Sequence, residues 1–85
     1  MQETKTDLTT DWVKLSDIIT VDSSKTYYIQ NRGNGILWLS EGSSVPTDGG
    51  IFVENFKIAE YKQGEQDLYL RSYSGTLVAN ISSEG

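Results

Sequence analysis

Apolar and polar residues alternate regularly in the last third of the chain. The apolar positions there are spaced two apart, at Leu68, Leu70, Leu77, Ala79 and Ile81. Because successive side chains of a strand point to opposite faces, this spacing predicts a β-hairpin in which Ser72 pairs with Leu77. Its other face would carry Tyr69, Arg71, Val78 and Asn80. A hairpin of this kind needs cover on one side only.

Residues 27–41 predict a second hairpin, which turns at Arg32-Gly33-Asn34-Gly35. The Asn-Gly step supplies the positive backbone angles that a tight hairpin turn demands. Pairing Asn31 with either Ile36 or Trp38 places apolar residues on both faces. One face would carry Tyr27, Ile29, Ile36 and Trp38, and the other Tyr28, Gln30, Leu37 and Leu39. A strand pair that is apolar on both sides must be covered on both sides, so we expect a partner chain here.

The segment from Asp11 to Ile19 fits two patterns. Trp12, Leu15 and Ile19 share a helical stripe, whereas Val13 and Leu15 share a strand face. We favour a strand, because the neighbouring sequence is rich in β-forming residues.

The composition favours strands throughout. Val, Ile and Thr supply 20 residues, while Ala supplies two. Clusters of Gly, Ser, Asn and Asp cut the chain into short runs, as a sandwich or barrel requires. The sequence therefore predicts an all-β fold, a small antiparallel β-sandwich or barrel of seven or eight short strands. Residues 1–9 are polar and rich in Thr, so they are expected to form a flexible arm before one sandwich domain over residues 10–85.

A chain of 85 residues has a thin core, and this one has no Cys to reinforce it. Small scaffolds without such staples often depend on oligomerisation, so we expect a homo-oligomer, with a trimer favoured. Trp12, Phe52 and Phe56 are expected in the core, as isolated aromatic residues usually are. Trp38, Tyr69 and Tyr73 are equally compatible with burial and with an interface, and Arg71 with a surface or interface ion pair.

The charge and residue types narrow the possible chemistry. The net charge is −5, without a run of Lys or Arg, which disfavours nucleic-acid binding. There is no His, which removes the commonest general base and metal ligand. A carboxylate pair of Glu54 with Glu60 or Glu65 is the remaining enzymatic option, but exposed acidic residues usually only solvate a surface. We expect no enzyme activity, cofactor or metal.

No apolar run is long enough for a bilayer span, and the N-terminus lacks the apolar core of a signal peptide. Synthesis in the cytoplasm is expected, without a membrane partner.

Several short phrases of the chain resemble a group of small virion proteins of tailed bacteriophages. The phrases are Tyr28-Ile29-Gln30-Asn31-Arg32-Gly33, Leu37-Trp38-Leu39-Ser40-Glu41, Ser44-Val45-Pro46, Asp48-Gly49-Gly50-Ile51, Leu68-Tyr69-Leu70-Arg71-Ser72 and Ser74-Gly75. The similarity covers residues 25–81. One departure is that residues 51–61 lack the Pro-Gly turn expected midway.

The resemblance implies a non-enzymatic structural protein, made in the host cytoplasm and carried in the virion. Such a protein decorates the capsid or associates with the tail, and it binds neighbouring phage subunits through apolar strand faces. A host-surface or carbohydrate-binding module of a tail fibre is the alternative. The candidate interface residues are Tyr27, Tyr28, Ile29, Ile36, Trp38, Tyr69, Arg71 and Tyr73.

Overall fold

A computed structural model describes residues 2–47, 50–62 and 66–84, which form eight strands and one short helix. The elements in chain order are β1 (Gln2–Leu8), β2 (Val13–Lys14), α1 (Leu15–Ile18), β3 (Thr26–Asn31), β4 (Leu37–Gly42), β5 (Ile51–Val53), β6 (Ile58–Lys62), β7 (Asp67–Ser72) and β8 (Leu77–Glu84). The predicted all-β fold is confirmed. The helix among these residues is too short to cross a membrane.

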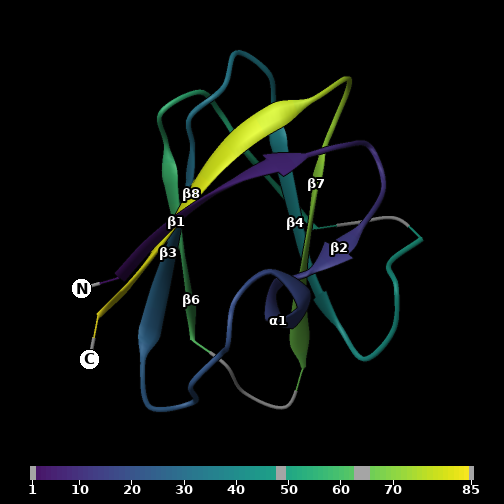
Figure 1. The fold of residues 1–85 in the computed structure, drawn as a ribbon. Helices are drawn as coiled ribbons and strands as arrows, with labels where there is room; N and C mark the ends of the chain where they lie inside the picture. Colours follow the sequence, from purple (N-terminus) through teal and green to yellow (C-terminus); the bar gives the residue numbers. More distant parts are fainter. Residues whose placement is uncertain (1, 48–49, 63–65, 85) are drawn as a thin grey trace.

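The strands form two antiparallel sheets, which face each other as a sandwich (Figure 1). The first sheet has the order β1-β8-β3-β6, and the second has the order β2-β7-β4-β5. Strands therefore pair as β1 with β8, β2 with β7, β3 with β6 and β4 with β5. A long hairpin folded over on itself gives this pairing, which is the topology of a jelly roll.

We call four of the connections between the two sheets arches. They comprise residues 9–12, 32–36, 54–57 and 73–76. The end of β1 lies beside the start of β8, where Leu8 pairs with Leu77, and the amide of Ser72 donates to the carbonyl of Thr9 at 2.8 Å. All four arches thus gather at one end of the sandwich, the upper end in Figure 1.

Both predicted hairpins are wrong in their pairing. β3 and β4 lie in different sheets, and so do β7 and β8. The expected turn at Asn34-Gly35 is also absent, because positive φ angles among the described residues occur only at Phe56, Gly50 and Gly75. The two-residue hairpin turns need positive φ at one or both central residues. Here the chain lacks it and passes to the opposite sheet.

The alternation still identified the buried residues of the second segment correctly. Leu68, Leu70, Leu77, Ala79 and Ile81 are all at most 4% exposed. In an arch, the inward side chains of the two strands face each other across the core. A two-residue spacing of apolar positions therefore fits an arch as well as a hairpin. In the first segment the inward residues are Tyr27, Ile29, Leu37 and Leu39. The prediction had placed Ile36 and Trp38 on the same face as Tyr27 and Ile29. Each of the two strands therefore covers one face with the core, and not two.

The prediction of a flexible N-terminal arm is wrong for residues 2–8. These residues form strand β1 at the edge of the first sheet. Charged Glu3, Lys5 and Asp7 are exposed, while Leu8 is buried and Thr4 and Thr6 are partly buried. The alternation of Thr with charged residues was the overlooked strand signal. Met1 lies outside the described residues.

The ambiguous segment contains both predicted elements. Val13 and Lys14 pair with β7, and α1 begins at the next residue. Leu15 is buried in the core, while Ile18 and Ile19 pack against it. The strand prediction was therefore wrong from Leu15 onward, where tertiary packing favours a single helical turn.

Candidate functional site

A row of large side chains crosses the outer face of the second sheet. Trp38 on β4 lies opposite Arg71 on β7 and opposite Phe52 on β5. The register of β2 with β7 extends the row to Trp12, which immediately precedes β2. Tyr73 joins it from the arch after β7, where its amide donates to the carbonyl of Ile36 at 2.9 Å. We call Trp12, Trp38, Phe52, Arg71 and Tyr73 the aromatic face.

The rings of the aromatic face contact one another closely, with Trp38 at the centre. Its ring centre lies 5.1 Å from Trp12, 5.3 Å from Phe52 and 5.9 Å from Tyr73. Phe52 and Tyr73 meet edge to face at 5.4 Å and 87°. Tilted and edge-to-face geometries are the favoured ones for aromatic pairs, so the rings hold each other in place.

Arg71 stacks on both tryptophans. Its guanidinium carbon lies 4.9 Å from the Trp38 ring centre and 5.6 Å from the Trp12 ring centre. The Nε group donates to the carbonyl of Ser72 at 3.0 Å. No carboxylate in the described part of the chain pairs with Arg71, since the one ion pair there joins Lys14 to Asp67. A positive charge without an acidic partner therefore lies among the rings.

The end of the aromatic face nearest the arches is open to solvent. Phe52 is 57% exposed and Tyr73 is 54% exposed. Together with Ile36 they line an apolar hollow of about 140 Å³. This volume suits an inserted side chain better than a cofactor, because ligand pockets usually measure about 300–1,000 Å³.

The structure brings together four of the predicted interface residues, namely Ile36, Trp38, Arg71 and Tyr73. Of the other four, three lie on β3 in the first sheet, and Tyr69 lies on the same outer face as Arg71 but is buried. Tyr27 and Ile29 are at most 2% exposed in the core, so they are unavailable to a partner. Tyr69 is only 5% exposed, with Lys14 Nζ 5.9 Å from its ring centre. Tyr28 is partly buried on β3, in the other sheet.

Sequence reasoning missed Trp12 and Phe52 as members of this site and placed Phe56 wrongly. All three were expected in the core, but Phe52 and Phe56 are 57% and 63% exposed. Trp12 stacks in the aromatic face instead. In an extended segment, Trp12 shares a face with Lys14, and Val13 lies on the opposite face. This alternation was the available signal that Trp12 lies on the outer face. Phe52 can be assigned to the outer face only from the pairing of β5 with β4, which places it opposite Trp38.

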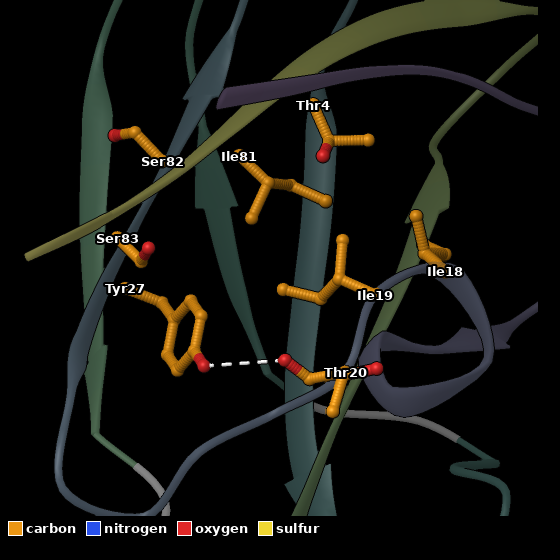
Figure 2. Close-up of a pocket in the computed structure, with 8 residues that line it drawn as sticks. All are labelled: Thr4, Ile18, Ile19, Thr20, Tyr27, Ile81, Ser82 and Ser83. Atoms are coloured by element: carbon orange, nitrogen blue, oxygen red, sulfur yellow. Dashed lines mark hydrogen bonds between the residues drawn. The ribbon is translucent and has the colours of Figure 1, made fainter. Parts of the chain in front are cut away.

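A second hollow, of about 360 Å³, lies at the end of the sandwich away from the arches. Figure 2 shows Tyr27 and Ile81 of the first sheet facing Ile19, with the Tyr27 hydroxyl bonded to the carbonyl of Thr20 at 3.4 Å. The eight described residues that line it include hydroxyls and isoleucines, but none carries a charge. They supply neither a carboxylate for acid–base chemistry nor one for a metal.

The candidate carboxylates Glu54 and Glu60 both line a groove between β5 and β6. Both are exposed, so they lack the desolvating cleft that a general acid needs. Glu65 lies outside the described residues. Within residues 2–47, 50–62 and 66–84, acidic side chains form no cluster that could hold a metal ion.

Comparison of the chain with family models, curated proteins and solved structures finds no match.

Proposed function

We propose that this chain is a non-enzymatic structural protein of a bacteriophage particle. It decorates the capsid or associates with the tail, and it binds a neighbouring virion subunit through the aromatic face. The phage assignment is supported by the sequence resemblance over residues 25–81. The mode of binding is supported by a single observation, the stacking of Arg71 between two tryptophans beside exposed Phe52 and Tyr73.

The residue types of this face are those that contribute most to protein interfaces. Trp, Tyr and Arg dominate the binding energy of such contacts. Trp and Tyr bury large areas at a small cost in side-chain entropy, and the Arg guanidinium adds stacking and charged hydrogen bonds. Burying the exposed part of Phe52 would contribute about 1–2 kcal/mol. The ring contacts already order Trp12 and Trp38, so binding a partner costs them little further freedom.

The charge of Arg71 defines the partner surface further. A partner that covered Arg71 with apolar groups alone would bury an uncompensated charge, which is costly. We therefore expect a carboxylate or a carbonyl at the centre of the partner surface, surrounded by apolar side chains.

The test has two steps. Mass spectrometry of purified particles should detect the chain, and its absence from them would refute the proposal. Particles stripped of the chain should then rebind the purified wild-type protein. Trp38→Ala, Arg71→Ala and Tyr73→Ala should each weaken rebinding about tenfold or more, as central interface residues do. Val45→Ala is the matched control, because Val45 is also exposed, at 60%, but lies in the loop after β4. Equal rebinding by all four variants would exclude the aromatic face.

Carbohydrate binding by a tail fibre is a second candidate, favoured by the exposure of Tyr73, whose carbonyl accepts a 3.5 Å hydrogen bond from the Arg71 guanidinium. Aromatic rings stack on sugars, and a guanidinium donates hydrogen bonds to their hydroxyls. A glycan array separates the two functions. Binding of a defined glycan that is lost in Tyr73→Ala would support this candidate over particle binding.

A further inference from the structure

The two edges of the sandwich differ in character. At one edge, β1 exposes Glu3, Lys5 and Asp7. Charged residues on an edge strand prevent pairing with other chains. At the other edge, β5 and β6 are the last strands of their sheets and line a groove of about 330 Å³. This second edge also carries charged residues, but they alternate with exposed apolar ones.

The β5–β6 edge concentrates exposed apolar residues. Of the seven large apolar side chains exposed in the described part of the chain, four belong to this edge. They are Ile51 at 57%, Phe52 at 57%, Phe56 at 63% and Ile58 at 59%. Ile51 lies opposite the core residue Leu39, so the groove exposes a side chain on the inner face of the second sheet. Contiguous apolar surface of this kind typically marks an interaction site.

The backbone of β6 is open to pairing on its outer side. The amide of Asn31 donates to the carbonyl of Lys57 at 3.1 Å, so this carbonyl points toward β3, whereas the Lys57 amide donates to the carbonyl of Glu54 at 3.0 Å. In an antiparallel sheet the direction of these groups alternates along a strand. Ile58, Glu60 and Lys62 therefore direct their N–H and C=O groups away from β3, to the free edge.

The charges on this edge favour a second copy of the same chain. Glu54, Lys57, Glu60 and Lys62 are two acidic and two basic residues, so their net charge is zero, whereas the whole chain carries −5. Two copies that meet here avoid the repulsion between their acidic surfaces. Glu60 and Lys62 are spaced two apart, on the outward side of β6. In antiparallel pairing about a two-fold axis at residue 61, Glu60 lies directly opposite Lys62 of the partner subunit, and this pair occurs twice.

We propose that the β5–β6 edge is a self-association surface, at which β6 of one copy pairs with β6 of a second copy about a two-fold axis. The pairing joins the two first sheets into one continuous sheet and covers the exposed apolar groove. A two-fold interface of this kind uses the same patch on both subunits. It produces a dimer in place of the trimer favoured from the sequence. This inference does not rest on the virion function, because the pairing strand β6 lies outside the aromatic face, although Phe52 borders both surfaces.

Analytical ultracentrifugation of the full chain at tens of micromolar tests the inference. The wild type should sediment as a dimer. Glu60→Lys and Lys62→Glu should each weaken dimerisation about tenfold. Each variant puts like charges at positions 60 and 62 of opposite subunits, and two-fold symmetry repeats this pair. The double variant Glu60→Lys with Lys62→Glu should restore it. A purely structural role for these exposed side chains would not produce this rescue.

Two further variants separate the edge from general destabilisation. Ile58→Asp should abolish the dimer, whereas Val45→Asp, which adds the same charge at a similarly exposed position, should retain it. Glu60→Pro should also abolish it, because it removes an outward N–H that makes no bond to β3. Circular dichroism confirms that each variant is folded. A monomeric or trimeric wild type, or a dimer that the charge reversals leave unchanged, would overturn the proposal. Particle rebinding by the monomeric charge variants is scored separately, so failure of one proposal does not imply failure of the other.

Discussion

The side-chain amide of Asn31, on β3, donates a 2.8 Å hydrogen bond to the carbonyl of Val53, on β5 in the opposite sheet. The same amide donates to the carbonyl of Gly35 at 2.7 Å, and its Oδ1 accepts from the amide of Gly33 at 2.9 Å. Asn31 is fully buried. One polar side chain thus joins the arch of residues 32–36 to the strand that leads into the next arch.

Asn31→Ala should lower the free energy of unfolding by about 2–4 kcal/mol, because it leaves buried carbonyl and amide groups without partners. Urea denaturation measures this effect. Asn34→Ala is the control, since Asn34 is exposed in the same arch, and it should change stability by less than about 0.5 kcal/mol. Equal losses in the two variants would contradict the role assigned to Asn31.

Gly50 and Gly75 form a matched pair of positive-φ glycines, at +97° and +69°. A Cβ atom at Gly50 would collide with the carbonyl oxygen of Leu39, whereas one at Gly75 would meet nothing within 4 Å. Gly75→Ala should therefore cost only the backbone strain, about 1 kcal/mol. Gly50→Ala should cost about 3 kcal/mol or more, because β5 must move away from β4. Thermal unfolding compares the two, and a larger loss for Gly75→Ala would be inconsistent with this packing.

Arg71→Lys should disturb the aromatic face while preserving the charge. The guanidinium of Arg71 is planar and stacks on two indole rings. A lysine ammonium has no planar surface, so it cannot stack in this way. We expect a loss of about 1 kcal/mol in stability and a red shift of tryptophan emission, as water reaches the rings. The chain has two tryptophans, and both contact Arg71, so the emission reports on this face alone. Arg32→Lys, in an exposed arch position, should leave the emission unchanged.

Tyr61 should make stability decrease at alkaline pH. Burial raises the pKa of Tyr61 above its ordinary value of 10.0, and the negative charges of Glu41 and Asp67 raise it further. The folded state therefore retains the phenol proton longer than the unfolded state does. The contribution of Tyr61 is fully present below pH 10.0 and is lost as the pH rises toward the higher folded-state pKa.

Tyr61→Phe should flatten this alkaline decrease. It also removes the 3.0 Å hydrogen bond from the Tyr61 hydroxyl to the carbonyl of Gln66, so stability at neutral pH should fall by about 1 kcal/mol. Urea denaturation at a series of pH values gives both quantities. An unchanged slope above pH 10.0 would show that Tyr61 is not the responsible group.

Much of the aromatic face could be found from the sequence, but not its full membership. Trp38, Arg71 and Tyr73 were predicted at an interface, and the structure places them together on the outer face of the second sheet. Tyr27 and Ile29 were included only because an incorrect hairpin gave them the same face as Trp38. Phe52 was assigned to the core because nothing in its own segment shows that it pairs with β4.

The sequence by itself determined the all-β class and the inward residues of β7 and β8, because alternating side chains report the face of a strand. Only the tertiary structure decided which strands pair, since a hairpin and an arch impose the same alternation. That choice depended on distant contacts, such as the bond from Asn31 to Val53, and on backbone angles at Asn34-Gly35 that do not close a hairpin. The same distant pairings assemble the aromatic face from three strands and two flanking connections, and they leave the β5–β6 edge open.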